Sequence, residues 1–171
     1  MKRLFFTAIV LIGITSTSFS QVKIKLGHID SMELLQSMPG RDTAQKSLQA
    51  FSNILETQFT AMNKEFETKY KEYQETGATL PKTILDNKQK DLQDLKSRIE
   101  AFEESAKKDL KEKENELLKP IIDKAKKAIE DVAKENGYTY IFDSSVGVLL
   151  YSEASDDIMP LVKKKLGIKT K

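Results

Sequence analysis

The sequence has no cysteine and no tryptophan, and it holds a single histidine, His28. The absence of cysteine excludes disulfides, zinc–thiolate sites, cysteine nucleophiles and lipid attachment through a modified cysteine. The sequence also lacks the phosphate-binding, dinucleotide-binding and nucleophile-elbow motifs. We therefore expect that the protein is not an enzyme, and that it has no catalytic, cofactor or metal site.

Glycine (7) and proline (4) are scarce among the 171 residues, so the chain has few turns. Charged residues make up 32% of the chain and the hydrophobic class only 39%. Long stretches rich in Ala, Leu, Glu, Lys and Gln complete a composition that is typical of long helices. The length allows one domain, compact or elongated, rather than two full cores.

The first twenty residues have the pattern of an export signal. A basic pair, Lys2-Arg3, precedes an apolar run over 4–14, and a small, polar segment ends at Ser20. The alternative is an uncleaved anchor, but an apolar run of about eleven residues is too short to span a bilayer. We expect an exported protein cut after Ser20, with no stable membrane anchor. The mature part has 26 basic and 26 acidic residues, so no bulk positive field attracts nucleic acid.

A continuous helix is predicted from Arg41 to Thr76, which contains no proline or glycine. Its apolar residues recur at steps of three and four that add up to eleven residues, the period of a nearly straight coiled coil. Segment 77–81 holds a glycine and a proline and predicts a turn. A return helix is predicted from Lys82 to Asn136 with the same period, kinked or loosened at Pro120. The two limbs predict an antiparallel helical hairpin over 41–136.

Three strands are predicted around this hairpin. One lies at 22–26 and leads into Asp30, and the others lie at 138–143 and 146–151, joined as a β-hairpin. A three-stranded sheet leaves open edges, and a hairpin that points away cannot cover it. We expect the chain to oligomerise through this sheet, with segment 146–151 as its most buried strand. The fold class is α+β, with a small β-rich body (21–40 and 137–171) into which the helical arm (41–136) is inserted.

Two short helices complete the predicted body. Asp30 is the expected N-cap of a helix that runs to Met38, with Glu33 three residues further on. Ser155 is the expected cap of a final helix that runs to Leu166. Acidic residues in its first turn and lysines in its last turn suit the helix dipole.

Few side chains are candidates for chemistry. His28 lacks the second histidine or cysteine that a metal site or a catalytic dyad needs. Asp30 and Asp143 both follow strands and are a conceivable hydrolytic pair, although a helix cap and a turn explain them better. The run Lys163–Lys165 is a conceivable polyanion site, and a solvated last turn of a helix is the favoured interpretation.

An aromatic and methionine stripe lies on the first limb of the arm. It comprises Phe59, Met62, Phe66, Tyr70 and Tyr73. One interpretation makes these residues the core of the two-helix arm. The other makes them a surface for promiscuous apolar contacts, to which methionine is well suited. Both can hold for different residues, because a two-helix arm has little depth.

The mature sequence resembles the Skp/OmpH family of periplasmic chaperones over its whole length. The strand that ends at Asp30 and the Met38-Pro39 step carry part of the resemblance. The C-terminal segments carry the more specific part: 121–129, 132–138, 141–143, 148–151 and 157–166. The arms match only in length and composition.

This resemblance implies a homotrimer in which three sheets form one β-barrel body and three helical arms enclose a cavity. It also implies an ATP-independent holdase that binds unfolded outer-membrane β-barrel proteins, without catalytic residues. Members with cationic arms attract clients partly by charge, whereas residues 41–136 here carry 19 basic and 20 acidic residues. We therefore expect apolar contacts, rather than charge, to be the main means of binding clients. The alternative function is a structural coiled-coil spacer or assembly subunit without unfolded clients.

Overall fold

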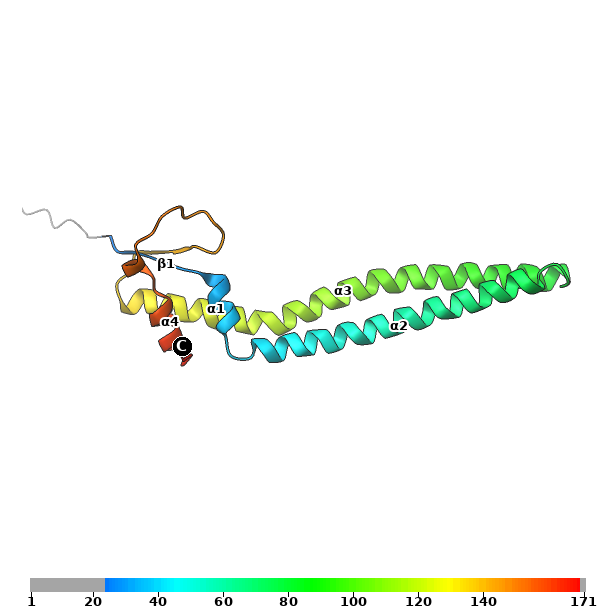
Figure 1. The fold of residues 1–171 in the computed structure, drawn as a ribbon, viewed down its shortest axis with the longest axis horizontal. Coiled ribbons are helices and arrows are strands. Elements are labelled where there is room, and N and C mark those ends of the chain that lie inside the picture. The colour runs from blue at the N-terminus through cyan, green and yellow to red at the C-terminus, as the bar shows by residue number, and fades with distance from the viewer. Residues whose placement is uncertain (1–23, 170–171) are drawn as a thin grey trace, which may run out of the picture.

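A long helical hairpin extends from one side of a small mixed body (Figure 1). The computed structural model describes residues 24–169. Its elements are, in order, β1 (Leu26–Ile29), α1 (Ser31–Ser37), α2 (Arg41–Thr76), α3 (Lys82–Glu135), β2 (Tyr140–Asp143), a 3₁₀ turn (Ala154–Asp156) and α4 (Met159–Lys165). Within this range, no helix combines the length and the apolar character needed to cross a membrane. The predicted export signal lies outside the described residues.

The predicted hairpin is confirmed, and it forms an elongated arm (Figure 1). Helices α2 and α3 have 36 and 54 residues, so α3 is about 80 Å long at 1.5 Å per residue. Pro120 lies inside α3, which continues through it as one helix. Gly40, with φ of 90°, precedes α2 in the left-handed conformation that glycine adopts at little cost.

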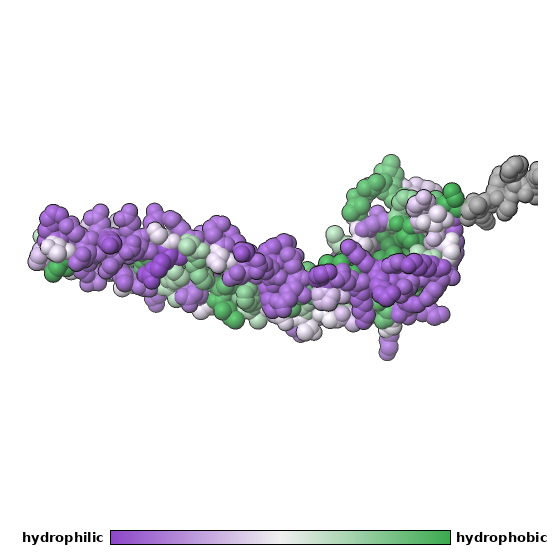
Figure 2. Space-filling view, turned by 180° about the vertical axis from the view of Figure 1, so that it is seen from behind, coloured by the Kyte–Doolittle hydropathy of each residue, from purple (hydrophilic) through white to green (hydrophobic). Residues whose placement is uncertain are grey.

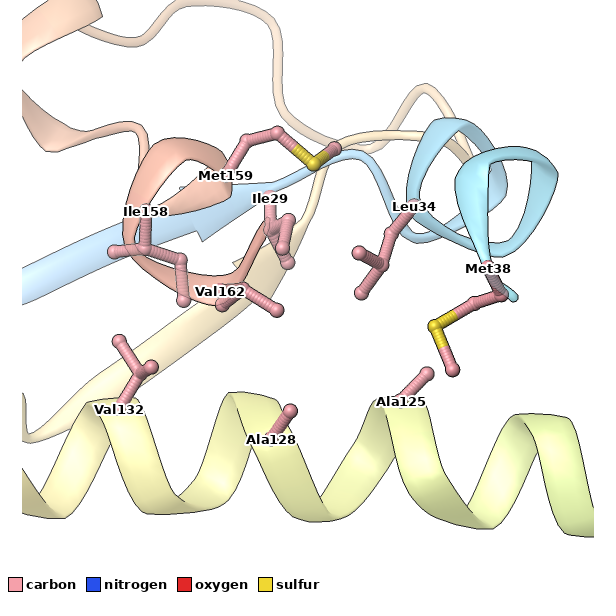
Figure 3. Close-up of a cluster of buried hydrophobic side chains, with 9 residues drawn as sticks. All are labelled: Ile29, Leu34, Met38, Ala125, Ala128, Val132, Ile158, Met159 and Val162. Carbon is pink, nitrogen blue, oxygen red and sulfur yellow. The ribbon is translucent and has the colours of Figure 1, made fainter. Parts of the chain in front are cut away.

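The hydrophobic core lies in the body and is closed by the end of the arm (Figure 3). Side chains from β1, α1 and α4 pack onto one face of α3, and the buried set is Ile29, Leu34, Met38, Ala125, Ala128, Val132, Ile158, Met159 and Val162. The last three turns of α3 therefore cover the sheet. The arm points away from the body as expected, but the expectation that it cannot cover the sheet was wrong, because small residues near the end of α3 allow close approach to the body.

The sheet has two parallel strands, β1 and β2, joined through the whole arm. Leu26 pairs with Tyr140 and His28 with Phe142. On the other side of β1, the backbone N–H of Ile158 donates to the carbonyl of His28 at 3.0 Å. Gly27 lies against the Tyr138 ring, and a Cβ at that position would lie 2.9 Å from a ring carbon. A side chain at position 27 would therefore force the Tyr138 ring to shift.

The predicted third strand, 146–151, does not form. This segment is an extended loop, and most of its apolar side chains are exposed: Val148 is 79% exposed and Leu150 96%, whereas Leu149 is half-buried. The expected burial of this segment was therefore wrong for the single chain. After the turn at Ser145, the loop leaves β2, so within one chain it has no strand to pair with.

The helix boundaries of the body are partly as predicted. Asp30 caps α1, because its carboxylate accepts a hydrogen bond from the Glu33 N–H at 2.8 Å. The final helix begins later than predicted, at Met159, after a separate 3₁₀ turn that contains Ser155. Asp157 rather than Ser155 satisfies its start, accepting from the Met159 N–H at 2.8 Å.

Candidate functional site

The predicted aromatic and methionine stripe lies along the edge of the seam between α2 and α3. Tyr70 is 46% exposed, and the other four members are half-buried. The rings of Phe66 and Tyr70 stack, with centroids 6.0 Å apart and planes 6° apart. Aromatic surface therefore remains open to solvent along the outer half of the arm, even though the same side chains contribute to its packing.

The register of the hairpin places the members of the stripe in different surroundings. The Lys88 ammonium contacts the Glu72 carboxylate at 2.8 Å, so these two residues lie at the same level of the hairpin. In this antiparallel register, Leu95 of α3 lies at the level of Phe66, and Leu95 is almost fully buried. The outer half of the seam is thus well packed, and Phe66 belongs to that packing.

The middle of the arm is packed less tightly. None of the α3 residues 96–124, all of them described, is fully buried. An apolar groove of about 310 Å³ opens between the helices at this level; its walls are formed mainly by Leu55, Phe59, Phe102, Ala106 and Leu110. A second hollow contacts Leu55 and Phe102 and includes the exposed Ile54. Figure 2 shows the corresponding apolar patch midway along the arm.

We call this groove the mid-arm groove. Of the predicted stripe, the structure brings only Phe59 into it. Leu55, Phe102 and Leu110 belong to the periodic apolar residues that predicted the two limbs, and nothing in the sequence singled them out as a site. In the sequence, the feature that could have indicated the groove is that Leu55 and Phe59 on one limb lie opposite Phe102 and Ala106 on the other. Periodicity alone does not reveal whether such a pairing fills the space between two helices.

Charges on the arm largely neutralise one another. Most lie in ion pairs three or four residues apart, such as Lys107 with Glu103 at 2.8 Å and Lys108 with Glu112 at 3.7 Å. The Lys107 ammonium donates hydrogen bonds to the Glu103 and Glu104 carboxylates, and these bonds raise the pKa of Lys107 above its ordinary value. Such exposed pairs contribute little to stability, but they leave no strongly charged surface along the arm.

The body carries a second apolar surface. Leu26, Tyr140 and Phe142 share the face of the sheet opposite the core, and all three are exposed. The loop adds Val146, Val148, Leu150 and Tyr151, also exposed. In Figure 2 an apolar stretch stands out from the body above the purple surface of the rest. Large exposed apolar patches of this kind mark interaction surfaces.

Asp30 and Asp143 have structural contacts rather than a shared reaction site. The Asp143 carboxylate accepts hydrogen bonds from the Ser31 hydroxyl at 2.6 Å, the Ser31 N–H at 3.2 Å and the Ser145 N–H at 3.0 Å. Burial by itself raises the pKa of Asp143, but these hydrogen bonds outweigh it and lower the pKa to about 2. Asp143 therefore ties the end of β2 to the start of α1.

The remaining candidates also have structural partners. A His28 ring nitrogen, Nε2, lies 3.2 Å from the Glu153 carbonyl and holds the end of the loop. Lys163 pairs with Glu33 at 2.7 Å, and Lys165 pairs with Glu135. Within residues 24–169, no three His, Cys, Asp or Glu side chains are placed to hold a metal ion.

The sequence of this chain matches a known protein family. The family model described as outer membrane protein (OmpH-like) matches residues 25–166, most of the chain. The chain belongs to the OmpH-like family. The resemblance noted from the body segments is thereby confirmed, and it extends across the arm.

Two curated relatives align with this chain over nearly their full length. Two proteins named chaperone protein Skp, from Photorhabdus luminescens and from Photorhabdus laumondii subsp. laumondii, are each 24% identical over 170 residues. The alignments cover 97% of this chain and 99% of each relative. A crystal structure of a candidate outer membrane chaperone (OmpH-like) from Caulobacter crescentus superposes with a TM-score of 0.71 at 13% identity, covering 84% of this chain and 83% of that one. This likeness confirms the fold.

Proposed function

We propose that this OmpH-like protein is an ATP-independent holdase of the periplasm that binds unfolded outer-membrane β-barrel proteins and prevents their aggregation. The observation that carries the proposal is the match over 97% of the chain to relatives named chaperones. This match includes both the arm and the body. The export-signal pattern at residues 1–20 supports the periplasmic location.

The arm has the physical properties that a holdase needs. An unfolded membrane strand exposes apolar surface worth about 25 cal/mol per Å² on burial. The stripe from Phe59 to Tyr73, half-buried except for the exposed Tyr70, and the mid-arm groove offer apolar contacts without one deep pocket. Many weak contacts hold a client without folding it. Release then needs no nucleotide if the client gains more free energy by inserting elsewhere.

The same proposal includes a homotrimer built through the body. The apolar loop at 146–151 and the outer face of the sheet are exposed in one protomer, although most of their side chains are of types usually found inside proteins. The outer edge of β2 has no neighbouring strand among residues 24–169. A loop from a second copy that pairs there would extend the sheet and bury both apolar surfaces, and three copies would close it into a barrel.

An aggregation assay tests the holdase function. A urea-unfolded outer-membrane barrel protein is diluted into buffer without nucleotide, with and without an excess of the mature protein over 21–171, and light scattering is followed. We expect scattering to fall by at least half, and an inert protein at the same mass concentration to have no effect. Scattering that is unchanged by the protein would leave the structural spacer as the better account.

A further inference from the structure

The mid-arm groove is lined by apolar side chains that the hairpin itself does not bury. Leu55, Phe59, Phe102 and Leu110 are only half-buried around a volume of about 310 Å³. This volume lies near the lower end of small-molecule pockets, which measure about 300–1,000 Å³. It is therefore a site for one or two side chains rather than for a whole partner domain.

The length of the groove limits the shape of its occupant. On α2 it extends from Ser52 to Phe59, and on α3 from Phe102 to Leu110. At 1.5 Å per residue these spans are about 10–12 Å. An extended chain rises about 3.3 Å per residue, so the groove matches about three residues. Two side chains at i and i+2 of a strand lie on the same face, about 6.6 Å apart, and fit within this length.

The charges at the rim restrict the chemistry of the occupant. Lys107 is paired with Glu103 at 2.8 Å and with Glu104 at 3.3 Å. Among the described residues, Glu56 takes part in no ion pair. The rim therefore has an excess of negative charge and no unpaired cation. By charge complementarity it suits a neutral or basic apolar segment and disfavours an anionic lipid headgroup.

We propose that the mid-arm groove holds a pair of large apolar side chains at alternate positions of an extended client segment. This inference rests on the proposed holdase function and assigns part of client selection to one site. The occupant is a polypeptide whose apolar residues alternate with neutral or basic polar ones, as in a half-buried β-strand. A segment with the same composition but with its apolar residues at every third position presents only one of them to the groove, because residues i and i+3 of a strand lie on opposite faces.

A groove-filling variant tests the assignment. Ala106→Phe places a ring in the groove, and Ala101→Phe adds the same ring at an exposed position of α3 outside it. Binding is measured by fluorescence anisotropy for two labelled ten-residue peptides of identical composition, one with four Leu and Phe residues at alternate positions and one with the same four residues at every third position. We expect wild type and Ala101→Phe to prefer the alternating peptide at least fivefold. Ala106→Phe should lose this preference, with helicity by circular dichroism unchanged.

A crosslinking measurement keeps the test decisive if Ala106→Phe disturbs the arm. Because the chain has no cysteine, Ser52→Cys at the groove and Ser47→Cys elsewhere on α2 each provide a unique thiol for a benzophenone label. Photocrosslinking to the alternating peptide should be at least threefold stronger from position 52 than from position 47. Equal yields from the two positions, or an unchanged peptide preference in a helical Ala106→Phe variant, would overturn the proposal.

The aggregation assay separates this proposal from the holdase function. If wild type suppresses aggregation but its groove shows no preference for alternation, the groove assignment is wrong and the holdase function stands. If wild type fails to suppress aggregation, the proposed function itself falls. Displacement of the peptide by anionic vesicles, rather than by unlabelled peptide, would also contradict the assignment, because the rim should disfavour anions.

Discussion

Replacing Leu150 by aspartate should prevent assembly without disturbing the protomer. The side chain is 96% exposed in the single chain, and exposed substitutions usually change stability by less than about 0.5 kcal/mol. In the proposed homotrimer it is buried, and burial of a leucine contributes about 2 kcal/mol. Three copies lose about 6 kcal/mol in total, which weakens assembly about 10⁴-fold at 1.36 kcal/mol per factor of ten. An unpaired charge in the interface adds several kcal/mol more.

Multi-angle light scattering after size exclusion, at micromolar concentration, measures this effect directly. Wild type should elute with the mass of three chains and Leu150→Asp with that of one, while circular dichroism at 222 nm stays the same. Ala78→Asp, which adds the same charge at the exposed turn of the arm, should remain trimeric. The reasoning is refuted if wild type is monomeric, or if Leu150→Asp keeps the wild-type mass.

Four further predictions concern the arm and the body. Client affinity should change less than about threefold between low and physiological salt. The reason is that residues 41–136 carry a net charge of −1 and that exposed charges are screened over about 8 Å at physiological salt. A tenfold drop in affinity on adding salt would refute this prediction. Tyr70→Ser should weaken client binding about fivefold with helicity retained, because it removes exposed aromatic surface; unchanged binding in titrations would place clients elsewhere. Leu95→Ala should destabilise the arm by about 2–5 kcal/mol in urea unfolding followed at 222 nm, since this leucine is only 1% exposed. The pKa of Asp143 is about 2, below its ordinary value, so its hydrogen bonds stabilise the body above about pH 4. This stabilisation is lost as the pH falls towards 2, and solvent screening limits it to about 1 kcal/mol. Asp143→Asn should therefore flatten this part of the profile of unfolding free energy against pH.

Local patterns predicted the arm well and the body less well. Helix α2 has the predicted bounds and α3 ends within one residue of them, because apolar spacing, the glycine and proline at 77–81 and the stop at 136–137 are local signals. Segment 146–151 has equally clear β-type composition, yet Val148 and Leu150 remain outside any strand. Strand formation needs a partner edge, and composition does not say whether that edge belongs to the same chain. The mid-arm groove was missed for a related reason, since spacing predicts which side chains meet but not how well they fill the space.

The parallel pairing of β1 with β2 has a consequence for the order of folding. These strands are separated by the whole arm, and joining the ends of a flexible loop of about 110 residues costs about 4 kcal/mol in chain entropy. A hairpin made of local contacts forms first and brings the two strands close together. Most of the chain entropy of loop closure is therefore lost before the strands pair. The arm thus brings the two strands of the body together, in addition to carrying the proposed client-binding surface. Equal shortening of both limbs should preserve folding, whereas shortening one limb alone should separate β1 from β2.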